Sequence, residues 1–179
     1  MNTSTQITIT ATTQMKDHQY TIIEAEVELT PTCEQDIIDA IQEELSDTID
    51  LLTEELHEEI SLLAIDDITI TSYGDLDNHS QIYQDLDTVY AINEADIDLD
   101  LDIILAYADN TSIDDLSNIE EAYQGQYDSD EEFAEQLAEE LGYINNNVSW
   151  PYTCIDWEHA SRELMYDYFE SNGYYFRNV

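Results

Sequence analysis

The stretch Ser129-Asp-Glu-Glu-Phe-Ala-Glu-Gln-Leu-Ala-Glu-Glu-Leu-Gly142 predicts one helix and the character of its surface. Ser129 and Glu132 have the spacing of a capping box, which satisfies free backbone N–H groups where a helix begins. Gly142 is typical of the residue just past a helix end. Apolar residues recur at every fourth position between these signals, namely Phe133, Leu137 and Leu141. The stretch therefore predicts an amphipathic helix whose outer face bears carboxylates.

The segment that follows carries a second set of helix and strand signals. Asp156 is suited to cap a last helix, which has apolar residues at helical spacing as far as Tyr168. Gly173 then leads into a short terminal strand, Tyr174–Phe176. This end of the chain therefore combines helices with at least one strand.

The N-terminal part begins with two stretches in which apolar and polar residues alternate. Residues 6–13 alternate apolar positions with threonine, and residues 20–29 alternate apolar positions with glutamate. Because strict alternation is typical of half-buried strands, the two stretches predict an antiparallel hairpin. Ile68 and Ile70 predict a third strand, which ends at Gly74. The glutamates of the second stretch fall on the polar face: Glu24, Glu26 and Glu28.

The segment after the hairpin has the period of a helix. Thr32 and Gln35 have the spacing of a second capping box, and apolar residues recur at helical spacing over 37–45. A similar pattern follows over 52–60, and it is compatible with one continuous helix.

The central residues predict a further helix and contain one ambiguous run. Residues 82–90 have apolar side chains at helical spacing. The run Asp96-Ile-Asp-Leu-Asp-Leu-Asp-Ile103 alternates strictly, which favours a strand, but its apolar residues and those that follow also fit a helix. We prefer the helix for residues 96–108. The whole pattern of helices and strands predicts the α+β class.

The charge of the chain restricts its partners. The sequence contains 43 acidic and three basic residues among 179, which gives a formal charge of −40. Such a field repels nucleic acids and membrane surfaces, so we expect neither as a partner. The expected partner is a protein surface that is itself strongly positive.

The acids form rows on the predicted helices. Carboxylates three or four residues apart on a helix have Cβ atoms about 5–6 Å apart. Phosphates of one DNA strand advance by about 3.4 Å each while they wind around the axis, so their separation in space is similar. At the density of duplex DNA, one charge per about 1.7 Å, this charge would extend over about 68 Å, which predicts an elongated chain. Ten acids are the candidate partner-binding residues that would stand in for phosphates: Asp36, Asp39, Glu43, Asp47, Glu54, Glu58, Glu131, Glu132, Glu135 and Glu139.

The sequence contains no motif of the common enzyme classes. It has no Walker A, GxGxxG or GxSxG loop. Asp96, Asp98 and Asp100 resemble the start of an EF-hand loop, but Leu101 and Tyr107 occupy the positions that need glycine and glutamate. The histidines are far apart and are expected on the surface: His18, His57, His79 and His159. We expect a protein that is not an enzyme and has no catalytic residue, no cofactor and no metal site.

The sequence favours a cytoplasmic protein. No apolar run is long enough to cross a membrane, and the first residues lack the basic and apolar regions of a signal peptide. Cys33 and Cys154 lack the CxxC spacing and are expected to be reduced thiols.

Two other functions are compatible with the charge. A scavenger of a basic DNA-binding protein would need negative charge and no particular geometry. A halophilic structural domain would use its acids for solubility, although the chain is rich in isoleucine, asparagine and tyrosine, which is unlike the usual halophilic composition.

Several segments of the C-terminal half resemble the ArdA antirestriction proteins. The most specific are the string Glu121-Ala-Tyr-Gln-Gly125 with the following Glu131-Glu-Phe-Ala134, and the ending Ile155-Asp-Trp157, Arg162-Glu-Leu164 and Tyr174-Tyr-Phe-Arg177. The resemblance covers about residues 104–179.

The resemblance implies both an architecture and a function. It implies an elongated α+β protein of three small subdomains with acidic helical faces, which we place at residues 1–74, 75–110 and 111–179, the last being the ArdA-like one. It also implies a homodimer that mimics bent B-form DNA and occupies the DNA-binding groove of type I restriction-modification enzymes. Proteins of this family are encoded by mobile genetic elements and phages and act as anti-defence proteins in the cytoplasm of the host cell.

Overall fold

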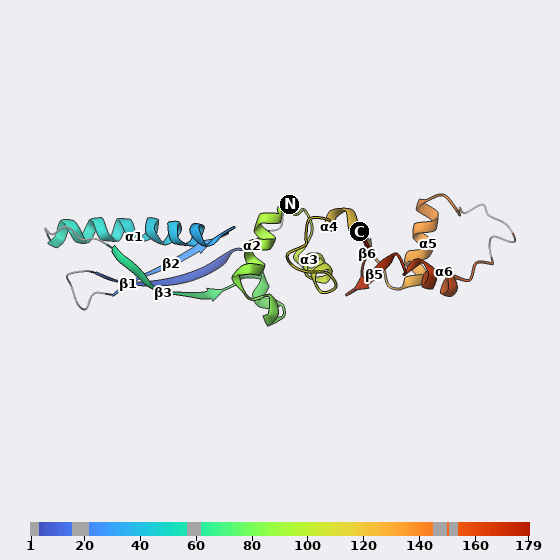
Figure 1. Ribbon diagram of the computed structural model, residues 1–179, viewed down its shortest axis with the longest axis horizontal. Coiled ribbons are helices and arrows are strands. Elements are labelled where there is room, and N and C mark those ends of the chain that lie inside the picture. The colour runs from blue at the N-terminus through green and yellow to red at the C-terminus, as the bar shows by residue number, and fades with distance from the viewer. Residues whose placement is uncertain (1–3, 16–21, 57–61, 145–149, 151–153) are drawn as a thin grey trace. The chain divides into compact units, whose positions relative to one another are not determined.

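A computed structural model describes residues 4–15, 22–56, 62–144, 150 and 154–179 (Figure 1). The chain divides into two compact units, residues 2–96 and residues 97–179. Each unit contains helices and one three-stranded antiparallel sheet, so the predicted α+β class is confirmed. The division into three subdomains stays a prediction.

The sheet of the N-terminal unit contains β1 (Ile7–Met15), β2 (Ile22–Leu29) and β3 (Leu62–Ser72) in the order β2-β1-β3. The predicted hairpin is confirmed, because β1 and β2 pair in antiparallel register. Ile7 and Ile9 are completely buried on one face, whereas Glu26 and Glu28 are exposed on the other. The strict alternation of the sequence thus gives the sheet one apolar face and one polar face, on which β1 contributes threonines and β2 contributes glutamates.

Helix α1 (Glu34–Leu56) covers the apolar face of this sheet and packs against β2 (Figure 1). The two predicted helical segments form one helix, as far as Leu56, and Ile60 lies outside the described residues. The residues that α1 turns toward the sheet are buried: Ile37, Ile41 and Leu45.

The capping box predicted at the start of α1 named the wrong residues, Thr32 and Gln35. The helix begins at Glu34, so Asp36 lies in its first turn, and the Asp36 side chain reaches back to the residues that precede the helix. The Asp36 carboxylate accepts hydrogen bonds from the Thr32 N–H at 2.7 Å, the Thr32 hydroxyl at 2.9 Å and the Cys33 N–H at 3.1 Å. The side chain of Gln35 instead donates to Asp39. Asp36 therefore has the place that glutamate has in a capping box.

The predicted helix over 82–90 is divided in the structure. Ile82 and Tyr83 belong to a short 3-10 helix, η2 (Gln81–Tyr83), and Ile82 is exposed. Helix α2 (Leu86–Ala95) begins only after Asp85, whose carboxylate accepts from the Thr88 N–H at 2.9 Å. The reason for the division is this cap, which satisfies a free N–H group and fixes the start of the helix.

Two close contacts hold the N-terminal unit together around α2 and η1 (Gly74–Asn78). The Asn93 side chain accepts from the Thr5 N–H at 2.6 Å and donates to the carbonyl oxygens of Thr5 and Pro31 at 3.0 and 2.8 Å. Gly74 has a φ of +62°, and a Cβ there would lie 2.1 Å from the Gln6 carbonyl oxygen. The chain needs glycine at 74 because both the conformation and the close approach exclude a side chain.

The ambiguous run over 96–103 is helical only in its second half. Asp96 has a φ of +51° and ends α2 in the left-handed conformation, and residues 97–100 follow without helical structure. Helix α3 (Leu101–Ala108) begins after this segment, and its residues 103–107 are buried. The helix preferred for 96–108 is therefore wrong for 96–100. There Ile97 is buried between exposed aspartates, as the alternating pattern indicates.

The C-terminal unit is built around its own sheet. After α4 (Ile119–Ala122), the strands β4 (Tyr123–Gln126), β5 (Tyr168–Ser171) and β6 (Tyr174–Arg177) pair in the order β4-β6-β5. Helices α5 (Asp130–Glu140) and α6 (Trp157–Leu164) pack against each other. The Asp156 cap of α6 is confirmed, because its carboxylate accepts from the His159 N–H at 3.1 Å.

Tyr168 corrects the prediction for the last helix. Helix α6 ends at Leu164, and Tyr168 lies in β5, where it pairs with Arg177. Tyr168 continues the helical pattern of the sequence but is not helical, because Asn172 and Gly173 form a two-residue turn. This turn pairs the residues before it, as β5, with β6. The predicted terminal strand at 174–176 is confirmed as β6.

The core of the C-terminal unit is aromatic. Phe176 and Phe133 are buried, and their rings lie at centroid distances of 4.7–5.7 Å from those of Tyr107, Tyr123, Phe169, Tyr127, Tyr168 and Tyr175. Rings of this kind bury a large apolar area for each residue. Phe176 is a core residue, whereas Trp157 is half-buried and Tyr152 lies outside the described residues.

Among the described residues, no helix combines the length and the apolar character that crossing a membrane requires.

Candidate functional site

Helix α5 carries a row of acids on its outer face. Glu131, Glu135 and Glu139 are exposed, and Phe133 and Ala134 are buried on the opposite side of the helix. The capping box predicted from Ser129 is present in part, because the Ser129 hydroxyl oxygen accepts from the Glu132 N–H at 3.2 Å. We call Glu131, Glu132, Glu135 and Glu139 the α5 ridge.

Two side chains of α5 differ from their predicted roles. The Glu132 carboxylate is exposed, but it accepts from the Asp128 N–H at 2.8 Å and is held at the start of the helix. Leu141 was expected in the apolar stripe, yet it is exposed, because α5 ends at Glu140 and Gly142 turns the chain away with a φ of +76°.

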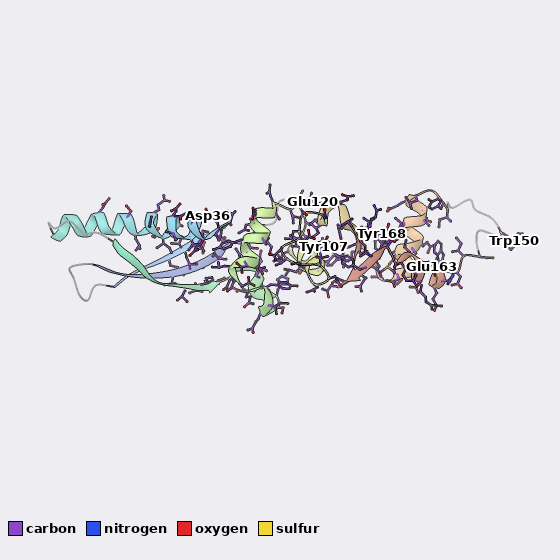
Figure 2. All side chains as sticks on the ribbon, viewed as in Figure 1. Asp36, Tyr107, Glu120, Trp150, Glu163 and Tyr168 are labelled. Carbon is purple, nitrogen blue, oxygen red and sulfur yellow. The ribbon has the colours of Figure 1, made fainter. Side chains whose placement is uncertain are left out.

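Helix α1 carries a second row. Asp39, Glu43, Glu44 and Asp50 are exposed, whereas the buried isoleucines and Leu45 occupy the other side. At about 100° of rotation per residue, Asp36, Asp39 and Glu43 fall within about 60° of one another on the helix. Figure 2 shows Asp36 near the N-terminal end of α1. We call Asp36, Asp39, Glu43, Asp47 and Glu54 the α1 ridge.

Three of the predicted residues cannot be placed as side chains. Asp47 and Glu54 belong to α1, but their side chains lie outside what the structure describes. Glu58 lies wholly outside the described residues. Their role stays a prediction.

Asp36 differs electrostatically from the rest of the α1 ridge. The hydrogen bonds from the Thr32 N–H and the Thr32 hydroxyl, followed by that from Cys33, hold the pKa of Asp36 below its ordinary value of 3.8. Asp36 is therefore ionised at neutral pH, but its oxygens are already engaged by the chain itself. Asp39 and Glu43 are exposed, whereas Asp36 is half-buried.

Asp36 is accordingly expected to act mainly on stability. Asp36→Ala removes the acceptor for the Thr32 and Cys33 N–H groups and should lower the midpoint of thermal unfolding at pH 7, measured by far-UV circular dichroism. Because the folded-state pKa is depressed, the contribution is complete above pH 3.8 and is lost as the pH falls through the folded-state value. The difference from wild type should therefore shrink in acid.

Asp39→Ala is the matched control for this change. It removes the same charge from the same helix, but among the residues that the structure describes Asp39 accepts a hydrogen bond only from the Gln35 side chain. An Asp39→Ala variant that loses as much stability as Asp36→Ala would contradict the assignment of Asp36 as the cap.

Sequence reasoning missed two further acidic rows. Glu26 and Glu28 are exposed on β2, where residues two apart are separated by about 6.7 Å. Asp98 and Asp100 are exposed in the segment before α3, and the Asp98 N–H donates to the Glu120 carboxylate on α4 at 3.2 Å. The strict alternation of both stretches was the available signal, but only helical rows were counted as site residues.

The basic residues neutralise little of this surface. Arg162 pairs with Glu158 one turn earlier on α6, and both side chains are largely exposed. Exposed pairs of this kind contribute little to stability. Arg177 is exposed, and Lys16 lies outside the described residues.

Burial raises the pKa of several tyrosines, and neighbouring carboxylates add to the effect. Burial, the largest cause, raises the pKa of Tyr73, and repulsion from Asp85 and Asp77 adds to the effect. Burial also raises the pKa of Tyr127, with Glu140 and Glu132 as the neighbouring charges. The pKa of other tyrosines is raised in the same sense, again with burial as the largest cause: Tyr90, Tyr107, Tyr123 and Tyr175.

The residue types of catalytic and metal sites are dispersed. Among the described residues no group of three or more histidine, cysteine, aspartate or glutamate side chains is arranged to hold a metal ion. His159 is exposed as predicted, His79 is half-buried, and the other two histidines lie outside the described residues. Cys33 and Cys154 are free and exposed.

No family model matches this chain, and no curated protein or solved structure matches it.

Proposed function

We propose that the protein is a DNA mimic that inhibits type I restriction-modification enzymes by competing with DNA for their binding groove. The observation that carries the proposal is the α1 and α5 ridges, which are rows of carboxylates on helices that contain no lysine or arginine. Like charges at this spacing destabilise a helix, and natural helices normally intersperse them with cations. The segments that resemble the ArdA proteins support the same function.

The proposed mechanism is electrostatic and stoichiometric. A DNA-binding groove presents lysine and arginine side chains to phosphates, and the ridges present carboxylates to the same side chains. Long-range attraction speeds association. Binding releases the ions that both surfaces hold, so the affinity should fall steeply with salt, as it does for DNA. The proposal includes no catalytic step, no cofactor and no direct contact with nucleic acid.

The structure allows the candidate residues to be ranked. Asp39, Glu43, Glu131, Glu135 and Glu139 are exposed, and we propose them as the principal phosphate mimics. Asp36 and Glu132 are engaged in capping their own helices, so we assign them a smaller part in binding. Asp47, Glu54 and Glu58 are retained as candidates by their place in the sequence.

The resemblance to the ArdA proteins also supports proposals about the oligomeric state, the location and the genetic origin of the protein. We propose that the protein acts as a homodimer in the cytoplasm of a host cell, as an anti-defence protein of a mobile genetic element or phage. A dimer would double the number of ridges available to one enzyme.

Competition against DNA tests the proposal. The purified protein is titrated into a type I methyltransferase bound to its labelled DNA site, at two salt concentrations, and displacement is followed by fluorescence anisotropy. Stoichiometric displacement that weakens at the higher salt is expected. Absence of displacement at the lower salt, with the protein folded there by circular dichroism, would rule out this target.

One observation favours the alternative function, a scavenger of basic proteins. Exposed acids also lie outside the two ridges, for example Glu26 and Glu28. A polyglutamate peptide of equal charge separates the two functions. If the peptide displaces DNA as well as the folded protein does, charge alone is sufficient and mimicry is not required. A halophilic structural domain would bind neither the methyltransferase nor a basic protein and would unfold at low salt.

A further inference from the structure

The β5–β6 hairpin turns through Asn172 and Gly173, which have no part in the proposed function. Ser171 pairs with Tyr174 on either side of the turn, so the connection has two residues. Both have positive φ, +55° at Asn172 and +84° at Gly173. Asn-Gly is favoured in such type I′ turns. Asn172 is exposed at the tip of the hairpin.

The same dipeptide is chemically labile. Because Gly173 has no Cβ, little hinders its backbone nitrogen from approaching the side-chain carbonyl of Asn172. In that reaction a bond forms between the Gly173 nitrogen and Cγ of Asn172, and the bond from Cγ to Nδ2 breaks. The proton of the Gly173 N–H leaves with Nδ2 as ammonia. Water then opens the cyclic imide at either carbonyl, which gives aspartate or isoaspartate.

We propose that Asn172 is a deamidation site that the folded hairpin restrains. The Gly173 N–H donates to the Glu170 carboxylate at 2.6 Å, and the Gly173 carbonyl oxygen accepts from the Tyr127 N–H at 3.1 Å. The first contact holds the peptide group between Asn172 and Gly173, and the second holds the peptide group that follows it, between Gly173 and Tyr174. The attacking nitrogen cannot reach Cγ unless the peptide group between Asn172 and Gly173 rotates, which breaks the hydrogen bond to Glu170.

The Glu170 carboxylate adds an electrostatic restraint. Attack requires the Gly173 nitrogen to lose its proton, and the resulting amide anion would lie beside a negative side chain. Repulsion between like charges disfavours that state. The hairpin thus restrains the reaction by its geometry and by its charge.

The isoaspartate product would not fit the hairpin. An isoaspartate linkage adds a carbon to the backbone inside a two-residue turn whose register places Phe169 opposite Phe176. Phe176 is completely buried, so a shift of this pair disturbs the core of the C-terminal unit. Isoaspartate formed in an opened hairpin would therefore make local unfolding permanent.

Peptide mapping by mass spectrometry tests the proposal on the full chain. The protein is incubated at mildly alkaline pH, folded in buffer and unfolded in concentrated urea, and isoaspartate is detected with isoaspartyl methyltransferase. Asn110, which is exposed and precedes Thr111, is the internal control. In urea Asn172 should react faster than Asn110, and in the folded protein the Asn172 rate should fall by about tenfold or more.

The variant Glu170→Gln separates the effect of the Glu170 charge on the deamidation rate from the effect of the hydrogen bond. Glutamine keeps an acceptor for the Gly173 N–H but removes the negative charge, so the rate in the folded protein should rise by about two- to tenfold. The rate in urea should stay the same. Equal rates for Asn172 in folded and unfolded wild type would overturn the restraint by the hairpin. An Asn172 no faster than Asn110 in urea would overturn the site itself, and an unchanged or lower rate in folded Glu170→Gln would overturn the role of the carboxylate.

Discussion

Replacement of Glu131, Glu135 and Glu139 together by glutamine is expected to weaken displacement of DNA from a type I methyltransferase by about 10- to 100-fold. An exposed ion pair contributes up to about 1 kcal/mol, and tenfold in affinity corresponds to about 1.4 kcal/mol, so three lost pairs account for this range. Each single replacement should cost less than about fivefold. The measurement is the competition titration at the lower salt.

Glutamine is chosen because it preserves the helix. Its helix propensity is close to that of glutamate, and all three side chains are exposed, so α5 should remain folded by circular dichroism. Glu132 is left intact because it accepts from the Asp128 N–H.

A matched triple variant separates the ridge from the overall field. Asp114, Asp115 and Glu121 are exposed in the same unit, outside α5, and their replacement by asparagine or glutamine removes the same charge. This variant should inhibit almost as well as wild type. Equal losses in the two triple variants would show that the field of the whole chain acts without a defined ridge. Loss of binding from one ridge substitution alone would instead indicate a hot-spot interface.

The elements that could be predicted are those with strong local signals. The Ser129 and Asp156 caps, the β1–β2 hairpin and the strand at β6 were predicted because caps and alternation depend on residues close in sequence. The α5 ridge follows from the same signals. Its four acids lie opposite the residues that the helical period places in the core.

The errors have a common physical cause, which is that two local signals competed. Residues 96–100 satisfy both the strand and the helix pattern, and the left-handed conformation of Asp96 decides between them. Tyr168 continues the helical period of α6, but the Asn172-Gly173 turn places it in a strand. That turn was visible in the sequence as a hairpin signal. The Asp36 cap could not be predicted in the same way, because Thr32 and Gln35 offered an equally good box one residue earlier.

Phe176→Ala is expected to destabilise the C-terminal unit by about 3–5 kcal/mol. Phe176 is completely buried in the central strand of the sheet, and its ring lies 5.3 Å from Tyr107, 5.7 Å from Tyr123 and 5.1 Å from Phe169 between centroids. The truncated side chain would leave a cavity among rings from α3, β4 and β5. Stability is measured by urea unfolding.

Tryptophan fluorescence reports this unit selectively, because both tryptophans of the chain, Trp150 and Trp157, lie in residues 97–179. Tyr166→Ala is the control, since Tyr166 is 79% exposed and its loss should change stability by less than about 0.5 kcal/mol. A Phe176→Ala variant as stable as the control would show that the aromatic core does not hold the unit together.

The same variant distinguishes geometry from charge. Phe176→Ala leaves the formal charge at −40, but the unit that presents the α5 ridge should unfold at a lower temperature or urea concentration than in wild type. A DNA mimic needs its carboxylates at fixed spacing, so inhibition measured where the unit is unfolded should fall at least as far as in the triple ridge variant. A scavenger of basic proteins needs only the negative charge, so its binding to a basic protein should fall little when the unit unfolds. Full inhibition by the unfolded unit would therefore remove the α5 ridge from the proposed site and leave the α1 ridge, or charge alone, to explain binding.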